Sequence, residues 1–225
     1  MLCDFSGRPL VKREACFGKN KQRRRPLAPL LDSEAHQSGI GKFSSSTRLA
    51  REQRGASLLG LQICEVQFRP GSYGFRPGLG CKDALREVDR LLKEGFVHVV
   101  DADLKAYFDS IPHDRLMALV KGSIGDGRVL SLIEGFLHQE IVTETARWQP
   151  ETGTPQGAVL SPLLANLYLH PLDLLMEHGG FRMVRYADDF VILCASEAEA
   201  AEALRLVSAW VSDAGLALHP DKTKV

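Results

Sequence analysis

Three aspartates end two apolar, strand-like segments, and their type and spacing could support metal-dependent chemistry. Asp188 and Asp189 are adjacent in RMVRYADDFVILCA (182–195), and Asp103 ends FVHVVDAD (96–103). Charged groups in apolar surroundings destabilise a fold unless a partner compensates them. In a continuous strand, neighbouring side chains point to opposite faces, so the adjacent pair could act together only in a turn.

A hairpin turn at residues 187–189 would place both carboxylates at one edge of a sheet, where a neighbouring strand could bring Asp103. Three carboxylates there repel one another unless a divalent cation lies among them. Ligation by oxygen alone, with open positions, suits Mg²⁺. Two such ions about 4 Å apart support in-line phosphoryl displacement. The alternative is an ordinary surface turn, in which Asp is common for backbone reasons.

The bulk composition is compatible with a protein that binds nucleic acid or metal. The 225 residues allow one large domain or two small ones, and the net charge is zero. Residues 1–70 are basic and residues 71–225 acidic, an asymmetry that favours such partners. Five scattered cysteines predict neither disulfides nor a zinc site. This cysteine usage makes a reducing cytoplasm the expected location, and without a membrane-spanning run or a signal peptide we expect no membrane partner.

Two regions of the chain differ in charge and in apolar periodicity. Residues 1–66 form a basic segment that we expect to be irregular or disordered, with a short apolar run at 56–66 that could be helix or strand. The cluster KNKQRRR at 19–25 could contact RNA phosphates or be solvated surface. Residues 67–225 have the periodicity of a folded domain.

Regular elements interleave along this second region. Apolar spacing predicts helices at residues 82–95, 113–123, 128–138, 158–179 and 197–215. Strand-like segments occupy residues 96–100 and 182–195, a further strand begins within 216–225, and residues 139–157 are a hairpin or loop. Because no regular βαβ rhythm is present, we predict an α+β fold with helices packed on one face of an antiparallel sheet.

Five blocks of sequence, taken in order, resemble the group II intron-encoded reverse transcriptase/maturase family of bacteria. They are SYGFRPG (72–78), VHVVDADLKAYFDSI (97–111), GTPQGAVLSPLLANLYLHPLD (153–173), YADD (186–189) and HPDKTKV (219–225). The resemblance covers about residues 67–225 and implies a reverse-transcriptase palm with partial fingers. It further implies an RNA-directed DNA polymerase that adds dNTPs to a DNA primer on an RNA template by two-metal nucleotidyl transfer.

The resemblance also implies a catalytic metal site. Asp103 matches the first metal-binding aspartate of the family, and Asp188 and Asp189 match the pair in the palm hairpin. The implied cofactors are two Mg²⁺ ions, with Mn²⁺ as a substitute.

Other positions match the family's substrate-binding residues. Phe108 matches the bulky side chain under the incoming sugar, although it could also be core packing beside a neighbouring tyrosine. Gln156 and Gly157 match the loop that approaches the dNTP, and Lys222 matches a lysine near the active site. Arg76 is predicted to have a structural role or to contact nucleic acid on the template side.

The match has gaps at both ends. The basic R-P-L-x-I-P block of the fingers is not found, since RPL at 8–10 is followed by Val11 and Lys12. The chain stops at Val225, within the block that holds Lys222. We therefore expect a chain truncated at both ends, without a thumb, and with weak or no autonomous polymerisation, because backbone contacts dominate nucleic-acid affinity.

Two alternatives to an active polymerase remain. The chain could be a non-enzymatic maturase, a splicing cofactor that binds intron RNA, or it could be an inactive gene remnant. A nucleotidyl cyclase has a related palm-like sheet, but its G-G-D/E-E-F hairpin signature is absent, and it would not explain TPQG at 154–157.

Overall fold

The computed structural model describes residues 64–139, 141–142, 147–148, 150–154, 158–220 and 222–225. Most of the segment predicted to be irregular, residues 1–66, lies outside this range, and so does most of the apolar run at 56–66. The boundary between that segment and the domain stays a prediction.

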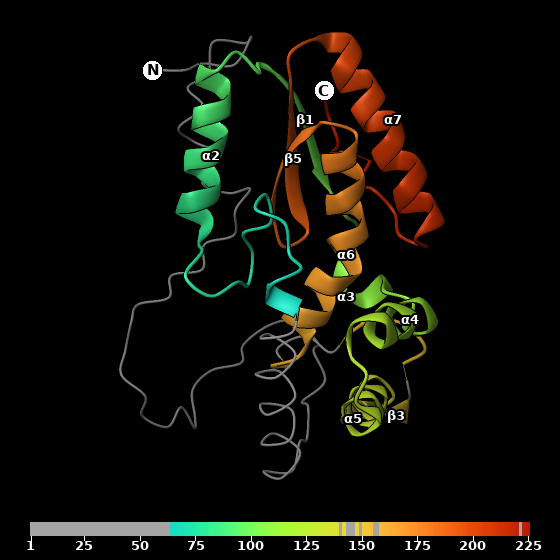
Figure 1. The fold of residues 1–225 in the computed structure, drawn as a ribbon. Helices are drawn as coiled ribbons and strands as arrows, with labels where there is room; N and C mark the ends of the chain where they lie inside the picture. The colour runs from blue at the N-terminus through green and yellow to red at the C-terminus, as the bar shows by residue number, and fades with distance from the viewer. Residues whose placement is uncertain (1–63, 140, 143–146, 149, 155–157, 221) are drawn as a thin grey trace, which may run out of the picture.

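A three-stranded antiparallel sheet forms the centre of the molecule (Figure 1). Its strands are β1 (His98–Asp103), β4 (Arg182–Tyr186) and β5 (Asp189–Cys194), in the order β1-β5-β4. The hairpin predicted within 182–195 is therefore present, and β1 joins it from a distant part of the sequence. A separate pair, β2 (Ile141–Val142) and β3 (Arg147–Trp148), lies within the region predicted as hairpin or loop.

The helices that the sequence predicts are all present, and one short helix was not expected. They are α2 (Cys81–Lys93), α3 (Tyr107–Ser110), α4 (His113–Ser123), α5 (Gly127–Leu137), α6 (Ser161–His178) and α7 (Glu197–Asp213). The unexpected helix, α3, follows Ala106, whose φ is 47°, and is too short for apolar periodicity to reveal it. Among the described helices, none is both long and apolar enough to cross a bilayer.

Helices cover both faces of the sheet. On one face Val100, Phe190 and Ile192 belong to the main core, with α6 and α7 packed over them. On the other face, Leu91 of α2 packs with Leu193. The α+β class and the antiparallel sheet are confirmed, but the prediction of helices on one face holds for α6 and α7 and not for α2. The strands are apolar on both sides, so a helix is needed on each.

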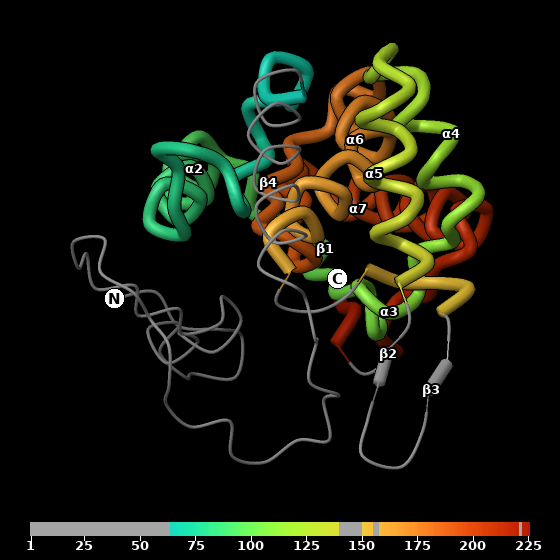
Figure 2. Tube along the Cα trace, turned by 90° about the horizontal axis from the view of Figure 1, so that it is seen from below, coloured from blue at the N-terminus to red at the C-terminus, as the bar shows by residue number. Residues whose placement is uncertain are grey.

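The helices on the side away from α2 form one group. Figure 2 shows α4 and α5 beside α6, on the opposite side of the sheet from α2. Contacts between α4 and α6 and between α4 and α5 join them to the main core. The hydroxyl of Tyr107 in α3 donates to the carbonyl of Ala165 in α6 at 2.6 Å, which attaches α3 to this group.

The last residues run beside β1 without forming the strand that the sequence predicts. Isolated bridges join Leu104 to Leu218 and Asp101 to Lys224. Between them the backbone turns, and the amide of Lys222 donates to the carbonyl of His219 at 3.3 Å. The turn interrupts the ladder and places Lys222 next to the end of β1.

Candidate active site

The pairing of β1 with β5 brings two of the three aspartates together. Asp103 and Asp189 are direct Cα partners in this antiparallel pair, so their side chains project from the same face. On the other side of β5, Asp189 pairs with Tyr186, which leaves Ala187 and Asp188 as a two-residue turn. The predicted hairpin is confirmed, with its turn at residues 187–188 and Asp189 as the first residue of β5.

The three carboxylates interact electrostatically. Burial raises the pKa of Asp188, and the nearby charge of Asp103 raises it further. Burial, followed by the charges of Asp188 and Asp103, raises the pKa of Asp189 to about 7. Carboxylates resist ionisation in this way when they are held close together with little water between them.

Lys222 brings a positive charge to this cluster from the end of the chain. Its ammonium group forms an ion pair with Asp103, whose side chain is largely buried, while the lysine side chain itself is 62% exposed. The hydrogen bond to Asp103 raises the pKa of Lys222. The structure thus places Lys222 at the predicted site, with a carboxylate as its partner; contact with a nucleotide phosphate stays a prediction.

The donor chemistry of the cluster fits a divalent cation. Within the described part of the chain, no three His, Cys, Asp or Glu side chains are already arranged to hold a metal ion. Asp103, Asp188 and Asp189 nevertheless offer only oxygen atoms, which hard cations prefer. Burial and mutual repulsion together raise the pKa of Asp189, and a bound cation would offset both. To join such a site, Asp103 would exchange its ion pair with Lys222 for the cation.

Phe108 lies in α3 within an aromatic group. Its ring makes an edge contact with Tyr107 at 5.5 Å between centroids and another with Phe75 at 6.2 Å. The ring is half-buried and packs against the main core. Both interpretations of Phe108 are therefore compatible with its position, since the side chain packs against the main core and is not fully covered.

The loop predicted to approach the dNTP is attached to α3 where it is described. The amide of Thr154 donates to the carbonyl of Phe108 at 2.6 Å, and the amide of Gly153 donates to the carbonyl of Ile111 at 2.8 Å. Gln156 and Gly157 lie outside the described residues, so their predicted contact with the nucleotide stays a prediction.

Arg76 makes contacts within its own segment. Its Nε donates to Oε1 of Glu65 at 2.7 Å, and its Nη1 donates to the carbonyls of Arg69 and Ser72, both at 2.8 Å. The guanidinium also lies 5.7 Å from the ring centroid of Phe68. These contacts account for the structural role considered for Arg76, and contact with nucleic acid stays a prediction.

A comparison with protein families identifies the chain. Residues 55–225 match the family described as reverse transcriptase (RNA-dependent DNA polymerase). The chain belongs to the reverse transcriptase family. Members of this family generally use divalent metal ions, in agreement with the oxygen-only donor set.

Two curated relatives refine this placement. An uncharacterized 91 kDa protein in a cob intron of Schizosaccharomyces pombe is 45% identical over 116 residues, which are 52% of this chain and 14% of that protein. The group II intron-encoded protein LtrA of Lactococcus lactis is 34% identical over 163 residues, 72% of this chain and 24% of LtrA. The predicted membership of the group II intron-encoded reverse transcriptase/maturase family is confirmed, although the chain spans no more than 24% of either relative's length.

A solved structure confirms the fold. Telomerase from Candida albicans, in a complex with a fragment of telomeric RNA, superposes with a TM-score of 0.60 at 12% identity. The match covers 79% of this chain and 35% of the telomerase chain. At such low identity the likeness shows the reverse transcriptase fold alone.

Sequence reasoning missed a buried polar group behind the hairpin of this reverse transcriptase. Arg185 is fully buried in β4, together with Asp173, Asn166 and Ser72. All four residues lie within or next to the family blocks, but those blocks did not indicate that the side chains meet. The available signal was an arginine between Val184 and Tyr186 in a strand-like run, which predicts a buried partner elsewhere in the chain.

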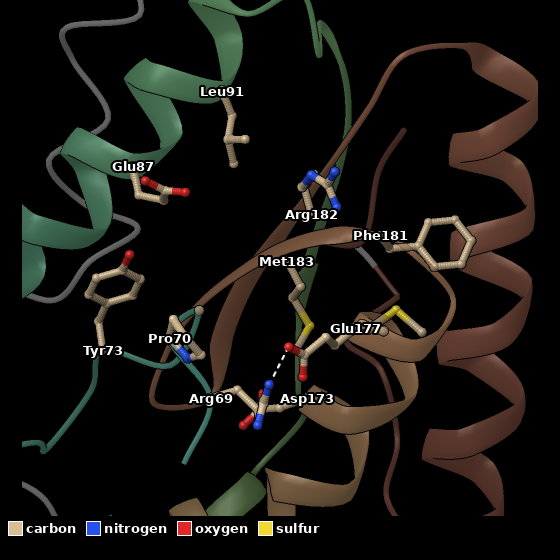
Figure 3. A pocket seen from close by; sticks show the side chains of 12 residues that line it. Arg69, Pro70, Tyr73, Glu87, Leu91, Asp173, Glu177, Phe181, Arg182 and Met183 are labelled. Carbon is tan, nitrogen blue, oxygen red and sulfur yellow. Dashed lines mark hydrogen bonds and ion pairs between the residues drawn. The ribbon is translucent and has the colours of Figure 1, made fainter. Parts of the chain in front are cut away.

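A pocket of about 320 Å³ lies between α2, β4 and α6 (Figure 3). Tyr73 and Glu87 line one side, and Arg69 and Glu177 form an ion pair on the other. None of Asp103, Asp188 and Asp189 lines this pocket. The predicted site at the sheet edge is therefore separate from this cavity.

Proposed function

We propose that this reverse transcriptase domain catalyses RNA-directed DNA synthesis, in which dNTPs are added to a DNA primer paired with an RNA template. The observation that carries the proposal is the register of β1 and β5, which sets Asp103 opposite Asp189 and next to the turn that holds Asp188. Three electrostatically coupled carboxylates at one sheet edge, in a chain of this family, suit nucleotidyl transfer.

Asp103, Asp188 and Asp189 would hold two Mg²⁺ ions, for which Mn²⁺ could substitute. When bound, these ions would lower the pKa of the primer 3′-hydroxyl and balance charge on the phosphates. In the reaction, that hydroxyl attacks the α-phosphate of the dNTP, a phosphodiester bond forms, and pyrophosphate leaves. The carboxylates contribute by holding the charges in fixed positions before the reaction begins.

The remaining residues would select and position the nucleotide. Phe108 would lie under the incoming sugar, where an aromatic ring leaves no room for a 2′-hydroxyl and so favours dNTPs. Its position is supported by the edge contact with Phe75. Gln156 and Gly157 would line the nucleotide from their loop, which is attached to α3 through Gly153 and Thr154. Lys222 would contact a phosphate after leaving Asp103.

The template and primer would be held through backbone and shape, because base pairing supplies the sequence information. Intron RNA is a second partner that we propose, since one relative lies in an intron and another is encoded by one. A filter-binding assay with intron RNA tests this second role. Binding that persists in Asp188→Ala would support a maturase function independent of polymerisation.

Single-nucleotide addition tests the main proposal. With poly(rA)/oligo(dT), dTTP and Mg²⁺ under single-turnover conditions, we expect slow addition that requires the divalent cation. Asp188→Ala and Asp103→Ala should each reduce the rate by at least about 100-fold, because the carboxylates act together in holding the cation.

The matched control is Asp89→Ala, which removes an exposed carboxylate on α2 whose partner is Lys93. Its rate should stay within about twofold of the unchanged chain, since exposed ion pairs contribute little. Addition that survives Asp188→Ala at the original rate would contradict the proposed site.

A further inference from the structure

The side chain of Arg185 is held by a fully buried set of polar partners. Its Nε and Nη2 donate to the two carboxylate oxygens of Asp173 at 2.8 and 2.5 Å. Its Nη1 donates to Oδ1 of Asn166 at 2.9 Å. Arg185 is 0% exposed and Asp173 4% exposed, so the guanidinium has one fixed orientation. A planar, bidentate pair of this kind gives directional control that a lysine could not reproduce.

This guanidinium reaches the turn that carries the aspartates. Nη1 also donates to the carbonyl of Ala187 at 3.0 Å. Ala187 has a φ of 60°, a left-handed conformation that an L-residue with a side chain rarely adopts. Such a conformation persists only where the surrounding structure imposes it. Arg185 therefore contacts the strained residue directly before Asp188.

The same guanidinium reaches a second segment. Its Nη2 donates to Oγ of Ser72 at 2.8 Å, and the backbone of Arg185 exchanges hydrogen bonds with Gly71 and Tyr73, both at 2.8 Å. Gly74 then approaches the turn so closely that a Cβ there would lie 2.2 Å from the amide nitrogen of Ala187. Residues 71–74 and the turn are thus packed backbone to backbone.

Residues 71–74 are also connected to Phe108, the aromatic residue proposed to lie under the sugar. Asn166 accepts from Arg185, and its Nδ2 donates to the carbonyl of Gly74 at 2.7 Å. The next residue, Phe75, makes the edge contact with Phe108. One buried set of hydrogen bonds therefore joins the turn before Asp188 to the support of Phe108.

We propose that Arg185 is a positioning residue, which fixes the turn at residues 187–188 against Ser72–Phe75 so that Asp188 can bind a divalent cation and Phe108 can screen the sugar. The inference rests on the proposed function and deepens it. A buried ion pair by itself is a poor stabiliser compared with apolar packing. The hydrogen bonds from Arg185 to Ala187 and Ser72 are not needed for charge balance. They are the bonds that connect Arg185 to the proposed site.

A double variant separates positioning from folding. Arg185→Met combined with Asp173→Leu removes both charges together and leaves no buried charge unpaired, so the fold should persist. We expect the Mn²⁺ affinity, measured by electron paramagnetic resonance titration, to fall about 10- to 100-fold, as when residues that orient metal ligands are lost. The preference for dTTP over UTP should fall in the same variant, while the cooperative thermal transition remains.

Two further variants keep the test decisive. Ser72→Ala removes one bond to the guanidinium and leaves the ion pair, so it should reduce Mn²⁺ affinity in the same direction but by less. The matched control is Arg205→Met with Glu202→Leu, which removes an exposed ion pair on α7 and should leave Mn²⁺ affinity unchanged.

The outcomes distinguish the inference from the proposed function. If Mn²⁺ binding depends on Asp188 but is unchanged in both the double variant and Ser72→Ala, Arg185 has only a structural role and the inference is overturned. If the unchanged chain shows no Mn²⁺ binding that Asp188→Ala abolishes, the proposed site itself fails, and the inference fails with it.

Discussion

Two clusters of charge lie close together, at the end of the hairpin strand β4 and at the turn that follows it, and they are compensated in different ways. Arg185 and Asp173 form a buried pair in which each charge has a matched partner. At the turn, Asp188 and Asp189 are held with Asp103, and Lys222 forms an ion pair with Asp103. The pair is complete within the chain. The aspartates are not, and we propose that this excess of negative charge suits them to an external cation, whereas the two charges of the buried pair already compensate each other.

The largest effect on stability should come from removing only one partner of the Arg185–Asp173 pair. Asp173→Ala leaves Arg185 buried without its counter-charge, and we expect a loss of about 3–5 kcal/mol in the free energy of unfolding. Urea denaturation followed by circular dichroism measures this loss. Asp213→Ala on α7, an exposed position, serves as the control and should change stability by no more than about 0.5 kcal/mol.

A loss of less than about 1 kcal/mol in Asp173→Ala would show that the buried pair is not compensated as described. The same curves address the interpretation of the chain as an inactive gene remnant. A cooperative transition in the unchanged chain would count against it.

A smaller, pH-dependent effect should come from the uncompensated cluster. Because the pKa of Asp189 is raised to about 7, the folded chain binds this proton more tightly than the unfolded chain does. The resulting stability is complete below about pH 4, the ordinary pKa of Asp, and is lost as the pH rises through about 7. Asp189→Asn should therefore flatten the fall in Tm between pH 5 and pH 8, measured without divalent cations.

The control for this pH dependence is Asp89→Asn, at an exposed carboxylate on α2, which should leave the slope unchanged. If Tm falls with pH equally in Asp189→Asn and in the unchanged chain, the negative charges of the aspartates are already compensated. The contrast with the Arg185 pair would then disappear.

The smallest effect should arise where the two clusters meet. Ala187 has its φ at 60°, and glycine would adopt this conformation without the cost of about 1–2 kcal/mol that a side chain brings. Part of this gain is offset, because glycine loses about 0.5–1 kcal/mol more entropy on folding. Ala187→Gly should therefore stabilise the chain by up to about 1 kcal/mol in urea denaturation. A clear destabilisation would show that the methyl group of Ala187 makes contacts that outweigh the strain.

The sequence was sufficient to predict that Asp103, Asp188 and Asp189 would meet, because they lie at the ends of two strand-like runs that belong in one sheet. The same periodicity predicted helices near α4, α6 and α7 within a few residues. These features depend on local spacing, which a single sequence displays directly.

Other features depend on contacts between distant residues. The burial of Arg185 requires Asp173 from α6 and Ser72 from a separate segment, so an arginine in a strand does not reveal its partners. The pairing of Lys222 with Asp103 joins residues 119 positions apart. Likewise, α2 packs on the second face because the strands have apolar residues on both sides. In strands this short, the sequence does not distinguish two apolar faces from one.

The isolated bridges on the two sides of the sheet also affect the tendency of the protein to aggregate. A three-stranded sheet has two edge strands, whose free backbone groups can pair with another chain and promote aggregation. Here Ser72 bridges to Arg185 along the outer side of β4, while Leu218 and Lys224 bridge to residues at the outer side of β1. The segments that bring Ser72 and Lys222 to the site therefore also occupy backbone groups at both edges, which limits strand addition by a second molecule.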